Sequence, residues 1–228
     1  MKEHLADIEP LGRASVEQRA ATALRELIVS GRLPEGMPLV QRDLAERLGI
    51  SQTPIRHALA ELERSGLVEF GETGRTLVRR LTREDLEELY AARLGLEGLA
   101  ARLGAESVGK LELERMREVL QRLDRLAKAQ DVDAYLVGRW DFHSIAYLAS
   151  GRTRLAAEVQ RLFWRGERYN RLVLSSPERF DRSVASYHAF HDACQVNDGA
   201  SAERVIHDSM RWAVDLIAGS LPSEQEVA

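Results

Sequence analysis

The segment that decides the fold is residues 44–59, which read LAERLGISQTPIRHAL. Apolar residues at helical spacing on both sides of a turn at 49–51 predict two short helices, over 42–48 and 52–64. Ser51 is a good N-cap for the second helix. Pro54 is compatible with that helix, because the first-turn N–H groups have no intrahelical partner to lose. Two short helices joined by such a turn predict a helix-turn-helix.

The helix predicted over 52–64 has two unlike faces. One face is apolar and is made by Ile55, Ala58, Leu59 and Leu62. The opposite face carries hydrogen-bond donors and small residues but no carboxylate, and is made by Gln52, Thr53, Arg56, His57 and Ala60. In a major groove, arginine can bond O6 and N7 of guanine, and glutamine can bond N6 and N7 of adenine. The face therefore predicts a DNA-reading surface, with an ordinary solvated helix face as the alternative.

The neighbouring residues extend this domain on both sides. Apolar residues recur at helical spacing from Val16 to Ser30, and Gly31 is typical of a residue just past a helix end. Downstream, residues 67–70 and 75–78 predict two short β-strands, joined by turn residues at 71–74. We expect Thr73, Gly74 and Arg75 at the tip to approach a phosphate backbone or minor groove closely, because glycine leaves room.

The composition of the chain changes after residue 82. Leucine, alanine, glutamate and arginine dominate there, and only Pro177 and Pro222 remain of the six prolines, which favours long helices. Thr82, with Asp85 three residues on, resembles a capping box that opens this region. Helices are predicted near 83–104, 108–129, 132–149, 152–174, 178–197 and 200–219.

The two regions resemble the two domains of one protein family. GRLPEG at 31–36, the segment 44–59 and LERSGLV at 62–68 match, in order and spacing, the winged-helix domain of GntR-type bacterial transcription regulators. LEELYAARLGLEGLAA at 86–101 is similar to the opening of the all-helical effector (FCD) domain of the FadR subfamily. Trp140-Asp141-Phe142-His143 and the later His188 fit the same domain.

The resemblance implies a mainly α fold. It consists of a winged helix-turn-helix with three helices and a small β-hairpin, followed by an antiparallel bundle of six to seven helices. The expected boundaries are a tail at 1–14, a DNA-binding domain at 15–80, an effector-binding and dimerisation domain at 81–222, and a tail at 223–228. The resemblance also implies a homodimer, since two-fold symmetric proteins read palindromic sites.

The family's DNA contacts fall by position on one set of residues. With the neighbours that share their surface, the expected DNA-binding residues are Arg42, Ser51, Gln52, Thr53, Arg56, His57, Gly74 and Arg75. Gln52 stands where this motif usually has arginine, and His57 where it usually has glutamate. Arginine at 52 would favour guanine, whereas glutamine either favours adenine or contacts phosphate alone.

Many FadR-type effector domains hold a divalent metal with one aspartate and three histidines, but this chain keeps half of that set. His143 and His188 match two histidine positions, while Arg139 stands in the aspartate position and Met210 in the last histidine position. Arginine has no lone pair for coordination, and methionine is a soft ligand. We therefore expect no cofactor, with a remnant divalent-metal site of His143, His188 and His207 as the alternative.

Arg139 changes the expected ligand of the effector domain. A cation between helices beside His143 and His188 would attract a carboxylate or phosphate directly. The hypothesis is a small anionic metabolite, of carboxylate or acyl type, bound without metal near these residues and Met210; the alternative is lost effector sensing. Arg93 is a further candidate for the site, or else an ordinary i,i+4 partner of Glu97.

Composition limits the remaining classes of function. The chain has 228 residues with a formal net charge of −4, so DNA contact must come from a local patch and not from bulk positive charge. A single cysteine, Cys194, suits a reducing cytosol and excludes an internal disulfide. The start of the chain lacks the apolar stretch of a secretory signal, and no apolar run is long enough to cross a membrane. A cytoplasmic location is expected.

The sequence does not favour catalysis. Cys194 and His191 are three residues apart, but a lone cysteine among apolar residues is far more often a core residue than a nucleophile. We therefore expect a DNA-binding transcriptional regulator, of the repressor kind by resemblance, acting on a short palindromic operator. The alternative is a helical protein-interaction module.

Overall fold

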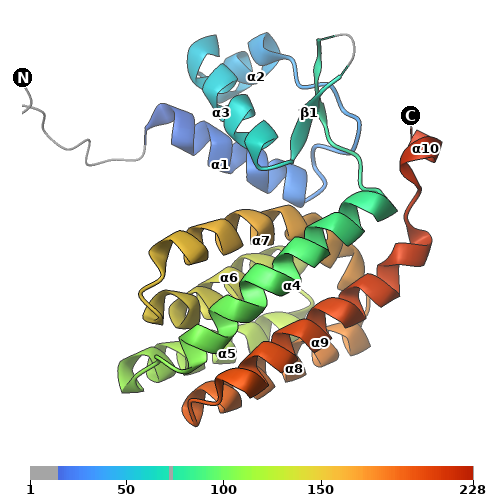
Figure 1. Cartoon of the computed structure of the whole chain (residues 1–228). Coiled ribbons are helices and arrows are strands. Elements are labelled where there is room, and N and C mark those ends of the chain that lie inside the picture. The colour runs from blue at the N-terminus through green and yellow to red at the C-terminus, as the bar shows by residue number, and fades with distance from the viewer. Residues whose placement is uncertain (1–14, 72–73, 228) are drawn as a thin grey trace, which may run out of the picture. The chain divides into compact units, whose positions relative to one another are not determined.

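The computed structural model describes residues 15–71 and 74–227, and the chain divides into two compact units, residues 1–79 and 80–228. The predicted tail at 1–14 and Thr73 at the hairpin tip lie outside the described residues. The mainly α fold expected from the sequence is confirmed, and Figure 1 shows the helices of both units.

Unit 1 contains the predicted helix-turn-helix and hairpin. Its elements are α1 (Val16–Val29), α2 (Gln41–Leu48), α3 (Gln52–Arg64), β1 (Val68–Phe70) and β2 (Thr76–Val78). The turn between α2 and α3 depends on Gly49, whose φ of 65° is a left-handed conformation that glycine adopts without steric cost. This turn places α3 across α1, where the two helices pack together.

Ser51 occupies the N-cap position of α3, as predicted, but its hydroxyl does not cap the helix. Its side chain makes no hydrogen bond to the helix. A cap oxygen accepts from the N–H of the second or third helical residue, and the third residue here is Pro54, which has no N–H. The first turn of α3 consequently keeps N–H groups that no side chain caps.

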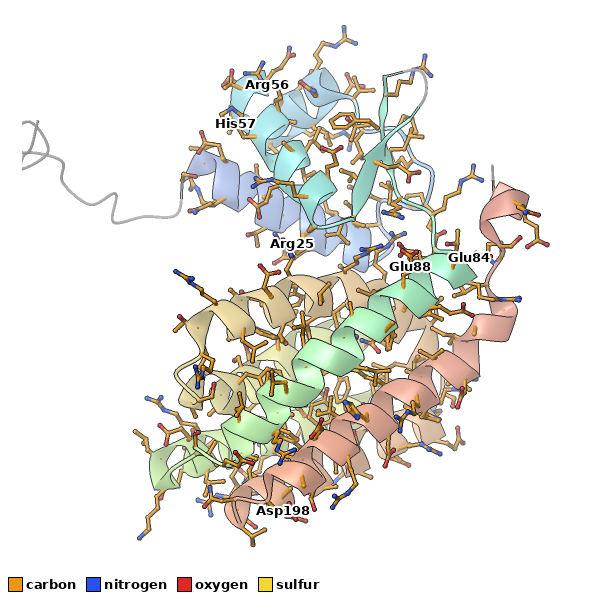
Figure 2. The ribbon with its side chains drawn as sticks, in the orientation of Figure 1. Arg25, Arg56, His57, Glu84, Glu88 and Asp198 are labelled. Atoms are coloured by element: carbon orange, nitrogen blue, oxygen red, sulfur yellow. The ribbon has the colours of Figure 1, made fainter. Side chains whose placement is uncertain are left out.

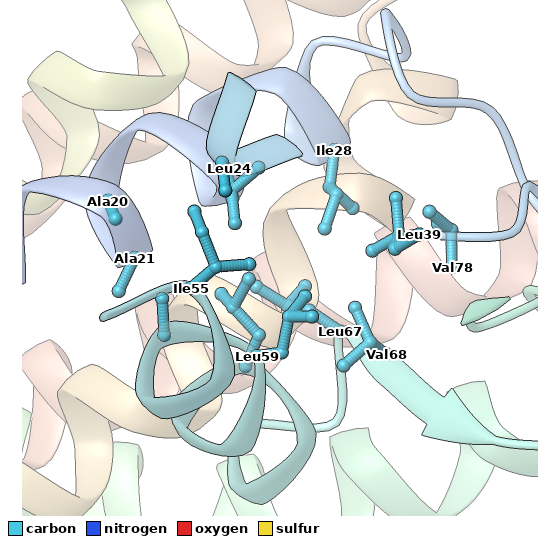
Figure 3. Close-up of a cluster of buried hydrophobic side chains, with 13 residues drawn as sticks. Ala20, Ala21, Leu24, Ile28, Leu39, Ile55, Leu59, Leu67, Val68 and Val78 are labelled. Carbon is cyan, nitrogen blue, oxygen red and sulfur yellow. The ribbon is translucent and has the colours of Figure 1, made fainter. Parts of the chain in front are cut away.

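The apolar face of α3 builds the core of unit 1. Ile55, Ala58, Leu59 and Leu62 are all at most 1% exposed, as the helical spacing predicts. They pack against Leu24 and other apolar side chains of α1 and against residues of the hairpin strands (Figure 3). Burial of this face forces the opposite face of α3 outward.

The hairpin is anchored to the loop that precedes α2. β1 and β2 are antiparallel, with Val68 opposite Val78. The backbone of the loop adds hydrogen bonds to β2: Gly36 N–H to Val78 O at 2.8 Å and Leu39 N–H to Thr76 O at 2.8 Å. The wing is therefore held on both sides of β2, and its tip at Gly74 has a left-handed φ of 71°.

Unit 2 is a helical bundle. Its long helices are α4 (Arg83–Ala105), α5 (Lys110–Ala129), α6 (Val132–Ala149), α7 (Thr153–Val173), α8 (Pro177–Gln195) and α9 (Gly199–Ile217). A 3-10 turn (Ala218–Ser220) and a short helix, α10 (Glu224–Val227), follow, the latter within the segment expected to be a tail. The Thr82 side chain accepts the N–H of Asp85 at 3.1 Å, which confirms the predicted cap of α4. α4 packs against α6, α7 and α9, and α5 packs against α6 and α8.

Candidate nucleic-acid interface and interior cavity

The N-terminal half of α3 presents the acid-free face predicted from its sequence. Gln52, Thr53, Arg56 and His57 are all exposed, and the first turn contains no acidic residue. Figure 2 shows Arg56 and His57 projecting from α3. The acidic residues of α3 lie in its C-terminal half, where Glu61 is paired with Arg25 of α1 at 2.8 Å. Arg25 therefore partly neutralises the Glu61 carboxylate, which reduces the repulsion that this carboxylate would exert on a DNA phosphate.

The start of α3 adds a second feature that suits a phosphate. Uncapped N–H groups and the positive end of the helix dipole together favour an anion at a helix N-terminus. Ser51 is exposed beside them, and its hydroxyl is not used as a cap. Arg56 follows one turn further along the helix. This end of α3 therefore combines backbone donors, a hydroxyl and a guanidinium.

The remaining predicted DNA contacts are also on the surface of unit 1. Gly74 and Arg75 are exposed at the wing. Arg42 is exposed on α2 and lies 3.4 Å from Asp43, a weak pairing between two exposed side chains. Hydrogen bonds from the Ser15 hydroxyl and from the backbone N–H of Glu17 lower the pKa of the Glu17 carboxyl on α1. His57 lowers this pKa further by a weaker electrostatic attraction.

The interior of unit 2 contains a buried ion pair that the sequence did not predict. Arg139 Nη1 of α6 lies 3.1 Å from Oε1 and 3.3 Å from Oε2 of Glu167 on α7, whose side chain is 0% exposed. Arg139 Nε donates to the Tyr187 hydroxyl at 2.6 Å, and Asn170 donates to Glu167 at 2.9 Å. Arg139 is thus a cation between helices, and a carboxylate from another helix already neutralises it.

Arg93 is paired in a similar way. Its Nε and Nη2 atoms donate to Oε2 of Glu97 at 3.0 and 2.9 Å, and Tyr147 donates to Oε1 of Glu97 at 3.1 Å. Both side chains of the pair are 3% exposed. Of the two interpretations of Arg93, the structure shows the i,i+4 pair, although the same guanidinium also lines the cavity described below.

Burial and charge determine the protonation of these groups. Burial acts to lower the pKa of Arg139, but Glu167 and Tyr187 outweigh it, so the pKa is raised and the guanidinium stays charged. Burial raises the pKa of Glu167, and Arg139 and Arg93 oppose that rise. The pKa of His143 is well below its ordinary value, through burial first and then through Arg139 and Arg93. His143 is therefore neutral.

The placement of His188 inside the domain is wrong. His188 is exposed on α8, and its Nε2 lies 3.0 Å from Asp124 of α5. The neighbouring residue, Tyr187, faces inward instead, with its ring 4.8 Å from that of His143. His207 is half-buried and its Nε2 contacts the Leu94 carbonyl at 2.9 Å. The three histidines of the alternative metal site therefore have different surroundings: His143 is buried, His188 is exposed and His207 is half-buried.

The residues at this position do not fit a divalent metal. Arg139 provides no lone pair, the phenol of Tyr187 and not an imidazole faces the interior, and Met210 provides only a soft thioether. Among residues 15–71 and 74–227, no three histidine, cysteine or carboxylate side chains gather as ligands could. The buried cation at this place is a guanidinium with its own carboxylate.

A small cavity adjoins the two ion pairs. Its volume is about 20 Å³, which is room for about one water molecule. Polar groups of five helices line it, together with Met210 and Trp212; the polar residues are Tyr90, Arg93, Arg139, Asn170, Ser183 and Ser209. Nearby, Nδ1 of His143 is buried without a hydrogen-bond partner among the described residues. The cavity is polar and tight.

Sequence reasoning missed Glu167 and Tyr187, although the helical periodicity contained a signal for each. On α8 the inward positions include Phe180, Ser183, Tyr187 and Phe190, a spacing that puts 187 inside and 188 outside. On α7, Glu167 follows Val159 and Phe163 at the same helical spacing. A carboxylate at a core position of an amphipathic helix indicates a buried partner of opposite charge.

We expect His143 to make the protein sensitive to mild acid. The unfolded chain takes up a proton near the ordinary pKa of 6.5, whereas folded His143 resists it. Its contribution to the free energy of unfolding is therefore constant above pH 6.5 and falls below it, by at most about 2 kcal/mol between pH 7 and pH 5, the limit set by an unfolded-state pKa near 6.5. Urea unfolding at both pH values should show this loss, and His143→Gln should lack it. An equal loss in both proteins would contradict the prediction.

Cys194 is a core residue. It is buried, and burial raises the pKa of its thiol to about 12, which leaves no thiolate for nucleophilic chemistry at neutral pH.

None of the described helices is long and apolar enough to cross a membrane.

These features define a class of protein: a winged helix-turn-helix with an acid-free exposed face, joined to an all-helical domain with a polar interior, is the architecture of a DNA-binding transcriptional regulator. The family model "Bacterial regulatory proteins, gntR family" matches residues 16–78, and the "FCD domain" model matches residues 87–211. The chain belongs to the GntR family, in its FadR-type branch with an FCD domain.

Known relatives agree with this assignment. The chain is 30% identical over 203 residues to a Paenarthrobacter nicotinovorans protein described as a probable D-xylose utilization operon transcriptional repressor, covering 86% of each chain. Its fold is similar to that of Escherichia coli McbR/YncC, with a TM-score of 0.81 at 21% identity, covering 91% of this chain and 99% of the other. A GntR regulator from Rhodococcus sp. RHA1 gives 0.74 at 24% identity, covering 90% and 99%.

Proposed function

We propose that this regulator is a homodimeric repressor that reads a short inverted repeat with the N-terminal half of α3. The observation that carries the proposal is the exposed face of Gln52, Thr53, Arg56 and His57, which has donors and no carboxylate. Arg56 and Gln52 are the base-reading residues, Ser51 and the uncapped start of α3 hold a phosphate, and Arg42, Gly74 and Arg75 contact the backbone or minor groove. The repressor described for the Paenarthrobacter relative supports the sign of regulation.

The effector we propose is a small anion, of carboxylate or acyl type, bound beside Arg93 and Arg139. The hydrogen bonds of Arg139 to described residues use Nε and Nη1, and its Nη2 group can donate to a ligand. Ser209 and Met210 line the same cavity as the two guanidiniums, and His143 contacts the ring of Tyr187, whose hydroxyl accepts from Arg139. A ligand of several heavy atoms requires the cavity to widen, since it holds about one water molecule.

The tightness of the cavity also favours a second candidate, a regulator without an effector. Both guanidiniums already have carboxylate partners, so the interior is electrically balanced without a ligand. A thermal-shift screen of organic acids, acyl thioesters and sugar acids separates the two. A stabilising acid whose effect disappears in Arg139→Met supports the effector site, whereas no shift with any compound supports the second candidate.

The DNA-binding proposal is tested by selecting fragments from random genomic DNA at low salt with the purified full chain. We expect recovery of a short inverted repeat, with binding that weakens steeply as salt rises, because phosphate contacts release counterions. Gel-shift titration at several salt concentrations measures the slope. A protein that enriches no sequence would overturn the proposal.

Arg56→Ala is expected to weaken operator binding by about 10- to 100-fold, since one bidentate base contact contributes about 1–3 kcal/mol. Arg64→Ala is the matched control on the same helix: Arg64 is exposed at the C-terminal end, where its Nε bonds the Ala60 carbonyl. Both variants should keep the wild-type circular dichroism spectrum. Equal losses in the two variants would mean that α3 contributes only general positive charge.

A further inference from the structure

Phe70 is the only phenylalanine, tyrosine or tryptophan among residues 15–79, and it lies outside the core of unit 1. It is 54% exposed, whereas the aromatic residues of unit 2 are all buried or half-buried. A phenylalanine ring is among the largest apolar groups that a side chain can add to a core. Unit 1 therefore leaves its one large ring available for another surface.

The register of the hairpin places this ring on the inner face of the wing. Side chains alternate along a strand, so Phe70 shares a face with Val68, which is buried in the core. Phe70 is opposite Thr76, which is also buried. The same alternation directs the carboxylate of Glu69 to the other face of the strand. The ring thus continues the core-facing side of the hairpin beyond the edge of the core, and the nearest carboxylate along its strand is directed away from it.

The ring adjoins the wing residues that are expected to contact DNA. One step closer to the tip, Gly71 N–H donates to the Arg75 carbonyl and Gly74 N–H donates to the Gly71 carbonyl, both at 2.8 Å. Phe70 is therefore one backbone pair away from the exposed Arg75. Figures 1 and 2 show the hairpin extending toward the end of unit 1 at which Arg56 projects from α3.

The other exposed apolar residues of unit 1 do not share this position. They are Val16, Met37, Val40 and Leu48, which lie on α1, in the loop before α2 and on α2. Single exposed aliphatic side chains of this kind are common on protein surfaces. Among the described residues of the hairpin strands, Phe70 is the one large apolar side chain that is exposed.

We propose that Phe70 is a wedge that enters the minor groove and makes the regulator prefer a flexible base step beneath the wing. This proposal rests on the DNA binding proposed above and adds a residue that reads deformability instead of hydrogen bonds. Proteins that bind the minor groove often insert an apolar side chain, phenylalanine among them, partly between two base pairs. Pyrimidine–purine steps such as TA and CA unstack most easily, so the ring favours operators that have one at this position.

The base-step preference is tested by selecting random DNA in parallel with the wild-type full chain and with Phe70→Thr. Threonine keeps a high strand propensity but has no ring. We expect both proteins to enrich the same bases where α3 reads the operator, and only the wild type to enrich TA, CA or TG steps beside them. Replacing such a step by the stiffer AA should weaken wild-type binding about fivefold and leave Phe70→Thr binding unchanged.

Gel-shift titration of the selected operator separates the ring from the charge beside it. Phe70→Thr should weaken binding about tenfold, the order of magnitude of one aromatic contact to a base. It should not change the salt dependence, because no phosphate contact is lost. Arg75→Ala should instead lower the slope of binding against salt by about one. Phe70→Leu keeps an apolar wedge and should keep the base-step preference.

Met37→Ala is the matched control in unit 1. Met37 is 39% exposed at the base of the hairpin, where its carbonyl accepts the Val78 N–H at 3.0 Å. Its side chain is apolar like that of Phe70 but is at the opposite end of the wing, so the substitution should leave operator affinity and base-step preference unchanged. Both variants should keep the wild-type circular dichroism spectrum, because each removes an exposed side chain.

The outcomes separate this inference from the proposed function. If Phe70→Thr binds the operator as tightly as the wild type does, the ring touches no DNA and the inference is overturned, while the DNA binding of α3 stands. A loss of affinity that is equal for operators with and without the flexible step also overturns it, because the ring would then only support the wing. A wild-type chain that enriches no sequence overturns both.

Discussion

Glu167→Ala is expected to lower the free energy of unfolding of unit 2 by about 3–5 kcal/mol. The substitution removes the carboxylate that lies 3.1 Å from Arg139 and leaves a buried guanidinium without a countercharge. It also removes the acceptor of the Asn170 amide. Trp140, Trp164 and Trp212 all belong to unit 2, so urea unfolding followed by tryptophan fluorescence reports this unit alone.

Two further variants show whether the unpaired charge causes the loss. Glu158→Ala, on the same helix but half exposed, should change the free energy of unfolding by at most about 0.5 kcal/mol. Arg139→Met combined with Glu167→Leu removes both charges and should recover most of the stability, since apolar side chains of similar volume often replace a buried pair at little cost. A double variant as unstable as Glu167→Ala would show that packing, and not charge, is responsible.

Ile55→Ala is expected to destabilise unit 1 by about 2–5 kcal/mol. Ile55 is 0% exposed in a core built from α1, α3 and the hairpin, so its removal leaves a cavity in a unit with few other core residues. Hydrogen exchange of the α1 and α3 amides should speed up, and operator binding should weaken with it. The tryptophan fluorescence transition of unit 2 should not move.

Glu63→Ala is the control for this prediction, because Glu63 is exposed on α3 and its removal leaves no cavity. It should leave amide exchange in α1 and α3 unchanged. If Ile55→Ala shifted the fluorescence transition by the same free energy as the exchange, the two units would unfold as one cooperative body, contrary to the expectation.

The sequence predicted unit 1 well because its structure depends on local rules. The spacing of Ile55, Ala58, Leu59 and Leu62 determines which face of α3 is buried, and the exposed face follows by geometry. Ser51 is the exception: its residue type predicted a cap, but Pro54, three residues later, lacks the N–H that would be the donor. Recognising that the Ser51 hydroxyl has no donor at Pro54 requires the position of each residue within the first turn of α3.

The interior of unit 2 could not be predicted to the same extent, because it depends on which helices meet. Arg139 and Glu167 are 28 positions apart and belong to different helices, so nothing local in the sequence marks them as partners. The prediction that His188 lies inside the domain was wrong by a single residue. Successive residues on a helix are rotated by about 100°, and Tyr187 is the residue that points inward. Matching by family position was less reliable here than the phase of the apolar residues.

Pro54 also has a consequence for the energetics of DNA binding. Because no side chain caps the first turn of α3, a phosphate bound to its N–H groups would take the place of solvent and would break no intramolecular hydrogen bond.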